Sequence, residues 1–155
     1  MTQEVQSAEE SADAANDAPR PFFILYLNGP EYVEELRRLS RWVEQLLLPV
    51  YGREVTSASP WCPRWREHPE AIGYLHALWL AWQDKTGPTA TMLGPLEWHR
   101  DHLRPIMDAL GSPDGPFAGC KRGAHRVKER PFVDDDGFLS PGPQFRTSPH
   151  PQPPA

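Results

Sequence analysis

The chain has 155 residues, with 16 basic and 21 acidic side chains and a formal net charge of −5. A chain of this length is usually one domain, and its acidic balance lacks the strongly basic face of a dedicated nucleic-acid binder. No apolar run is long enough to cross a bilayer, and the first residues lack the basic and apolar regions of a secretory signal. We therefore expect a cytoplasmic protein with reduced cysteines and no membrane partner.

The two ends of the chain have compositions that favour disorder. Residues 1–20 are acidic and almost free of large apolar side chains, so they cannot bury enough surface to offset the entropy of ordering. The other end begins with the basic stretch "CKRGAHRVKER" and closes with "SPGPQFRTSPHPQPPA", whose prolines exclude helix and central strand. We therefore predict a disordered acidic leader at 1–20, a helical domain at 21–120, and a basic, then proline-rich disordered tail at 121–155.

Three helix patterns in the central region predict an all-α domain. The first pattern starts after Asn28, has Pro30 in its first turn and repeats apolar residues at helical spacing, and Pro49 is expected to end or bend it. The second runs from about His68 to Asp84, with an apolar arc wide enough for a central helix. The apolar stretch "FFILYL" before the first helix is interpreted as a hydrophobic lead-in rather than a strand.

The third pattern and the long loop complete the predicted architecture. Residues 95–110 form the third helix, with Leu96 and His99 on its inner face and a kink at Pro105. Residues 52–66 are too many for a tight turn and too apolar for free solvation, so we expect them to pack across the bundle; a short hairpin is the alternative. The prediction is a small three-helix domain with a long, irregular, Trp-rich loop.

Cysteines and histidines near the helix ends suggest a zinc site. The predicted ligands are Cys62, His68, His102 and Cys120, and His99 is a possible substitute for one of them. Zinc commonly takes two cysteines and two histidines in a tetrahedron, and these positions converge if the second and third helices are antiparallel. The spacing argues against the site, because it lacks the close ligand pairs of known structural sites. The alternative makes Cys62 a small buried apolar residue and His102 a surface partner of Asp101. Spacing alone favours this alternative, in which no cofactor is bound.

Catalytic signatures are absent from the sequence. It contains no G-x-S-x-G, no HExxH, no phosphate-binding loop and no glycine-rich dinucleotide fingerprint. Asp101 and His102 as an acid/base pair, or Cys62 as a nucleophile, are weaker hypotheses, because a catalytic residue needs further groups within reach. The sequence therefore leans towards a non-enzymatic protein with no catalytic residues.

Tryptophan and arginine cluster at the start of the second helix. Four of the six tryptophans fall within "WCPRWREHPEAIGYLHALWLAWQ", which begins at Trp61. The sequence favours a core for these tryptophans; a partly exposed contact surface is the alternative, because Trp and Arg dominate protein–protein hot spots. The predicted interaction surface consists of Trp61, Arg64, Trp65, Arg66, Trp98 and Asp101. A nucleic-acid surface built from Arg64, Arg66 and the basic segment 121–130 is the alternative.

Three sequence blocks resemble a known family. "WCPRWREHPEAIGYLHALWLAWQ", "WHRDHLRPIM" and "GPFAGC" are similar to the actinobacterial domain of unknown function 4913, over residues 30–125. The resemblance implies a small accessory protein of plasmids, integrative elements or phages, for which no activity is established. On that basis we expect a non-enzymatic module of a mobile element that acts through an unknown protein partner.

The resemblance also bears on the zinc hypothesis. The family pattern contains a Cys, a His, an Asp-His and a terminal Cys, which match Cys62, His68, Asp101-His102 and Cys120. This match strengthens the zinc hypothesis without deciding it. Two positions depart from the pattern: Arg104 stands where the family often has an acid, and His99 stands where an aromatic residue is expected.

Overall fold

A computed structural model of the chain describes residues 22–121 and 124–131. The predicted leader at 1–20 and most of the predicted tail lie outside these residues. Across the described ranges the chain is helical, with no strand and a single isolated bridge between Lys121 and Ala124. No helix in this part of the chain is long and apolar enough to span a membrane. The prediction of a mainly α-helical domain is confirmed.

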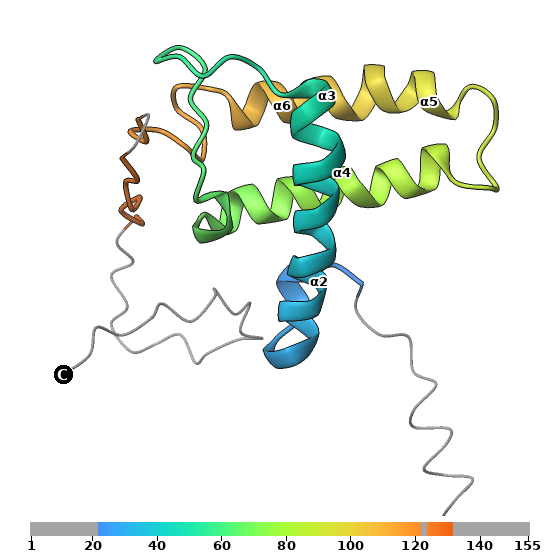
Figure 1. Ribbon diagram of the computed structural model, residues 1–155, viewed down its shortest axis with the longest axis horizontal. Coiled ribbons are helices and arrows are strands. Elements are labelled where there is room, and N and C mark those ends of the chain that lie inside the picture. The colour runs from blue at the N-terminus through green and yellow to red at the C-terminus, as the bar shows by residue number, and fades with distance from the viewer. Residues whose placement is uncertain (1–21, 122–123, 132–155) are drawn as a thin grey trace, which may run out of the picture.

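Three helical stretches build the fold (Figure 1). The first crosses the other two, which lie side by side and are joined by the turn at 87–93. A short 3₁₀ turn, η1 (Ile24–Tyr26), precedes the first stretch. The predicted hydrophobic lead-in is therefore confirmed, and the alternative of a strand is excluded. The stretches are α2 (Gly29–Trp42), η2 (Val43–Leu47) and α3 (Leu48–Tyr51); then α4 (Pro69–Thr86); then α5 (Gly94–Glu97), η4 (Trp98–Leu103) and α6 (Arg104–Leu110).

Two of the stretches pass through a π-helical turn just before an internal proline. The turn η2 ends two residues before Pro49, and η4 ends two residues before Pro105. Proline lacks an N–H group and its ring clashes with the carbonyl one turn back, and the wider π turn relieves both effects. The helix therefore continues past Pro49 to Tyr51, which excludes the predicted end at that proline.

The π turn explains an error in the predicted inner face of the third helix. Leu96 is 58% exposed and His99 is exposed, whereas Trp98 is fully buried. A π turn adds one residue, which rotates the preceding residues by about 100° relative to a continuous α-helix. Met107 and Leu110 follow the turn and are buried, as the helical spacing predicts.

The long loop packs across the ends of α4 and α6, as predicted (Figure 1). It contains no strand, which excludes the hairpin, and it leads into a 3₁₀ turn, η3 (Trp65–Glu67). The ring of Trp61 packs on Phe117, with 4.8 Å between the ring centroids. Trp65 and Phe117 are buried in the core, so the loop and the segment after α6 pack against each other over the start of α4.

Candidate metal centre

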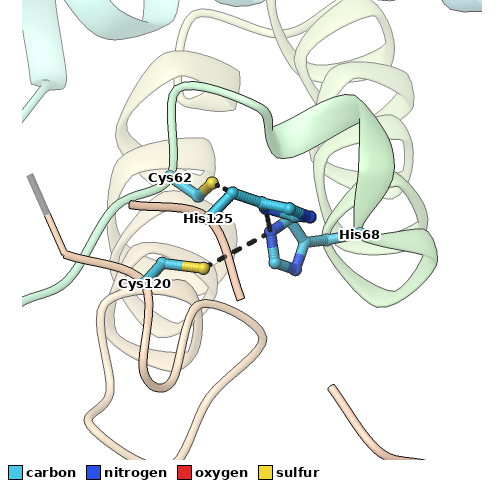
Figure 2. Close-up of side chains that lie close together, drawn as sticks. All are labelled: Cys62, His68, Cys120 and His125. Carbon is cyan, nitrogen blue, oxygen red and sulfur yellow. Dashed lines mark hydrogen bonds between the residues drawn. The ribbon is translucent and has the colours of Figure 1, made fainter. Parts of the chain in front are cut away.

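Four cysteine and histidine side chains meet where the loop, α4 and the C-terminal segment come together (Figure 2). They are Cys62 at the end of the loop, His68 directly before α4, and Cys120 and His125 in the segment after α6. Their ligand atoms all lie within 4.8 Å of one another. Cys62, His68 and Cys120 are buried, and the His125 side chain is 9% exposed. The cluster is therefore a closed, largely dry site.

Three separations between ligand atoms agree with a tetrahedral zinc centre. Zinc lies about 2.3 Å from sulfur and about 2.0–2.1 Å from nitrogen, which places two ligand nitrogens about 3.3 Å apart and a nitrogen and a sulfur about 3.6 Å apart. In the structure, Nε2 of His68 is 3.2 Å from Nδ1 of His125. Sγ of Cys62 is 3.3 Å from Nδ1 of His125, and Sγ of Cys120 is 3.7 Å from Nε2 of His68.

The outer partners of the two rings fix where their protons lie. Nε2 of His125 is 3.2 Å from the carboxylate of Glu67, so it carries the proton and Nδ1 keeps its lone pair. The His68 ring donates to the carbonyl of Pro116, and Nδ1 is the donor because Nε2 faces the cluster. In the neutral rings, two lone pairs thus face each other with no proton between them. This arrangement suits a cation better than a hydrogen bond.

Backbone N–H groups support the two sulfur atoms. The N–H of Arg126 points at Sγ of Cys120 over 3.4 Å, and the N–H of Arg64 bonds the Cys62 thiol. Burial raises the pKa of Cys62 and the nearby Cys120 thiol adds to the rise, while the Arg64 N–H opposes it. Burial, helped by His125, lowers the pKa of His68. Without metal both side chains are therefore neutral near pH 7, and a bound cation would release thiol protons.

Local sequence explains how two of these side chains are placed. Pro69 begins α4, and the residue before a proline prefers extended backbone, which His68 adopts with φ −108° and ψ 98°. Gly119 has φ +80°, a conformation that favours glycine, and it turns the chain immediately before Cys120. A Cβ at Gly119 would also collide with the side chain of Arg126, so glycine lets the C-terminal segment lie against the turn.

The structure brings together three of the four predicted ligands and replaces the fourth. Cys62, His68 and Cys120 converge, whereas His102 lies on η4 and is not part of the cluster; His125 takes its place. His125 was missed because composition assigned residues 121–155 to a disordered tail. A usable signal was present, since Cys62-x5-His68 and Cys120-x4-His125 are two Cys–His pairs of similar spacing.

The tryptophans of the predicted interaction surface belong mostly to the core. Trp65 is 2% exposed and Trp98 is fully buried, which agrees with the favoured core and excludes both from the predicted interaction surface. Their large rings fill the space between the loop and the helices, so they stabilise the fold through the apolar area that they bury. Trp61 remains half-buried and is the tryptophan of this set that keeps an accessible face.

The charged members of that surface are exposed, and each contacts a neighbour within the domain. Arg64 pairs with Glu67 at 2.7 Å. Arg66 pairs with Glu44 and lies over the Trp65 ring, 5.0 Å from its centroid. Asp101 pairs with Arg100 at 2.7 Å rather than with His102, and this contact lowers the pKa of the Asp101 carboxyl. The predicted contact between Asp101 and His102 is therefore replaced by a pair with the preceding arginine.

A groove is lined in part by Trp61 of the Trp-rich loop. Its volume is about 270 Å³, and its apolar walls include Leu48, Val55, Pro60, Trp61 and Met107. Arg53 also lines it and pairs with Asp108 at 2.7 Å. Among the features of the Trp-rich loop, this groove agrees best with the predicted role in protein contacts.

The fold and the cluster define a small helical domain with a Cys2His2 arrangement. The chain belongs to the family described as domain of unknown function DUF4913, whose family model matches residues 36–135. This match confirms the resemblance on which the zinc hypothesis partly rested; it carries no information on source organism or genetic setting. No curated protein and no solved structure matches the chain.

Proposed function

We propose that this domain binds one zinc ion through Sγ of Cys62, Nε2 of His68, Sγ of Cys120 and Nδ1 of His125. The observation that carries the proposal is the convergence of two sulfurs and two histidine lone pairs at tetrahedral separations. Two thiolates and two neutral imidazoles would neutralise the charge of the ion, as expected for a buried site.

The role of the ion is structural rather than catalytic. A catalytic zinc keeps one coordination position for water or substrate, whereas four protein ligands fill the tetrahedron. The ligands come from the loop, the start of α4 and the segment after α6. The ion would therefore hold together three parts of the chain, and two of these parts lack regular secondary structure.

Ligand substitutions distinguish this proposal from the ligand set predicted from sequence. We expect about one zinc per chain in the wild-type protein, and loss of zinc in Cys120→Ser and His125→Ala. His102→Ala is the matched control and should keep the metal. Measurement of zinc by mass spectrometry after exhaustive dialysis decides the matter. Zinc lost from His102→Ala but retained by His125→Ala would refute the proposed ligand set.

A second candidate function concerns protein contacts, and the groove beside Trp61 favours it. In this proposal the protein is a non-enzymatic accessory of an actinobacterial mobile element, and the groove receives an apolar segment of a partner protein. Support comes from the apolar lining, which includes Val55 with 45% of its surface exposed. The genetic setting is an expectation from the sequence resemblance alone, and flanking genes for transfer or integration would test it.

The groove proposal has its own test. Crosslinking from a photoreactive residue at position 55 should capture one defined protein in the host cell, and Trp61→Ala should abolish the capture. A photoreactive residue at exposed Met92, on the turn between α4 and α5, is the control. Equal capture from both positions would contradict a specific groove.

Nucleic-acid binding is a weaker proposal. Arg64 and Arg66 are already paired with Glu67 and Glu44, so phosphate contacts would depend on the basic segment 121–130, of which 122–123 lie outside the described residues. Binding of this kind should weaken steeply as salt is raised. A salt-independent signal, or none, would exclude it.

A further inference from the structure

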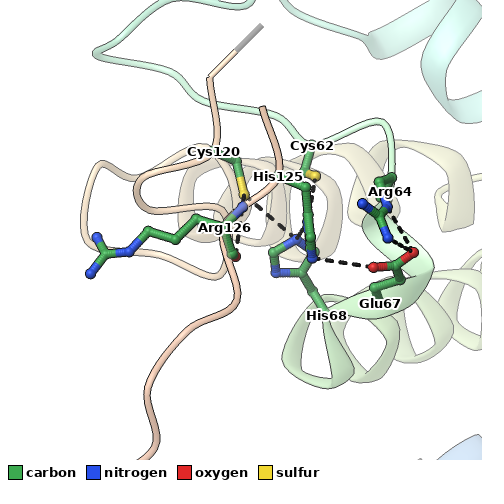
Figure 3. A network of polar contacts seen from close by, with 7 residues as sticks. All are labelled: Cys62, Arg64, Glu67, His68, Cys120, His125 and Arg126. Carbon is green, nitrogen blue, oxygen red and sulfur yellow. Dashed lines mark hydrogen bonds and ion pairs between the residues drawn. The ribbon is translucent and has the colours of Figure 1, made fainter. Parts of the chain in front are cut away.

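Glu67 links the second histidine of the cluster to an arginine at the start of the same turn (Figure 3). Its Oε2 lies 3.2 Å from Nε2 of His125. Its Oε1 is held by Arg64, with 2.8 Å to Nε and 2.7 Å to the terminal nitrogen. A carboxylate held from one side by a guanidinium is fixed in orientation, so the side from which it meets the histidine ring is fixed as well.

The same arginine also contacts the cysteine ligand of the loop. The backbone N–H of Arg64 bonds the Cys62 thiol while its side chain holds Glu67. One residue of the turn therefore connects Cys62 directly, and His125 through Glu67. Because the two ligands are 63 residues apart in sequence, this connection sets how the loop and the C-terminal segment face each other.

Resting on the zinc site proposed above, we propose that Glu67 is a positioning residue for the metal. It keeps the proton of His125 on Nε2, so that Nδ1 presents its lone pair to the ion. His125 needs this help more than the other ligands, because it comes from a segment whose described backbone pairing is the isolated bridge between Lys121 and Ala124. Outer partners of metal-binding histidines commonly change metal affinity by about 10- to 100-fold.

Glu70 supplies a matched control. It lies three residues further along, is similarly exposed (50% against 45%), and also holds the C-terminal segment, through Lys128 at 3.4 Å. It has no contact with a cluster ligand among its described interactions. If Glu67 acted only as a surface charge that attracts this segment, Glu70→Ala would weaken zinc binding as much as Glu67→Ala.

The experiment measures zinc affinity of the full chain by competition with a chromogenic chelator. We expect Glu67→Ala to bind about 10- to 100-fold more weakly than wild type, Glu67→Gln to recover part of the loss because its amide oxygen still accepts from Nε2, and Glu70→Ala to match wild type. Equal affinities for Glu67→Ala and Glu70→Ala would overturn the role of Glu67 and leave the zinc site intact. A wild-type chain that binds no zinc would overturn both.

A second readout needs no metal. In ¹⁵N NMR spectra of the zinc-free full chain, His125 should show the tautomer protonated at Nε2, and Glu67→Ala should give a mixture of the two tautomers. His76, which has its own carboxylate partner in Glu35, is the internal reference and should not change. A His125 tautomer that is unaffected by Glu67→Ala would contradict the proposed positioning.

Discussion

Two buried histidine sites in this domain have opposite hydrogen-bonding patterns. At the junction of η1, α2 and α4, the fully buried His76 accepts the Ile24 N–H at Nδ1 over 3.4 Å and donates from Nε2 to Glu35 over 2.9 Å. Each of its nitrogens has a partner of the complementary kind. In the cluster, His68 and His125 turn lone pairs toward each other and toward two sulfurs. The comparison teaches that neighbours, rather than burial, separate a structural histidine from a metal ligand.

Removing zinc should give the largest effect, because the proposed ion would join the loop, the start of α4 and the C-terminal segment. With free zinc at about 1,000 times its dissociation constant, chelation should lower the free energy of unfolding by about 4 kcal/mol. Urea denaturation with and without chelator measures the difference. The loss should fall on the loop and the C-terminal segment first, as hydrogen exchange would report. Identical unfolding curves would contradict this difference between the sites, since the cluster would then need no metal for its stability, like the His76 site.

His76→Leu should have the next largest effect, and it should leave zinc binding unchanged. The substitution keeps an apolar side chain in the core but leaves the buried Ile24 N–H without its acceptor, while Glu35 loses one partner and keeps its ion pair with Arg38. A buried donor left unpaired costs about 1–3 kcal/mol. Urea denaturation gives the cost, and metal analysis of the same sample gives the stoichiometry. Loss of zinc from a variant that is still folded would show that the two sites are not independent.

In the zinc-free chain, two groups of the cluster should lower the stability of the fold, one at acid pH and the other at alkaline pH. Because the folded-state pKa of His68 is lowered, the unfolded chain binds more protons below about pH 6.5, and stability falls as the pH drops through that value. The raised pKa of Cys62 acts oppositely, so stability falls as the pH rises above about 8.5. Zinc should abolish the alkaline loss, because it binds the thiolate. An alkaline limb unchanged by zinc would exclude Cys62 as a ligand.

His99→Ala should have the smallest effect. The ring donates from Nδ1 to the carbonyl of Pro95 at 2.6 Å and accepts from Tyr51 at 2.7 Å, but it is exposed to solvent. Water replaces both contacts in the variant, so we expect a loss of about 0.5 kcal/mol or less and full zinc content. A loss comparable to that of His76→Leu would mean that burial contributes little to the difference between these histidines.

Helical periodicity and proline positions were enough to predict the three helices. Starts at or one residue before prolines 30, 69 and 95 hold in the structure, because they depend on neighbours within one turn. The π turns were not predicted, since they reflect how an internal proline is accommodated in a packed helix. They shift the buried face, which is why Leu96 and His99 are exposed and Trp98 is buried in their place.

The candidate site was predicted only in part, for a different physical reason. Three ligands lie at helix ends or beside the core, where local pattern is informative. His125 lies in a segment whose composition alone favours disorder, and its order in the structure depends on contacts with residues more than 50 positions away. The burial of His76 was not predicted either, because its hydrogen-bond partners come from η1 and α2 and not from its own helix.

X-ray absorption spectroscopy of the zinc-loaded full chain tests the central claim most directly, because it reads the atoms bound to the metal. We predict two sulfur ligands at about 2.3 Å and two nitrogen ligands at about 2.0–2.1 Å, with one sulfur lost in Cys120→Ser. A first shell of nitrogen and oxygen alone, or a chain that takes up no zinc, would contradict the account.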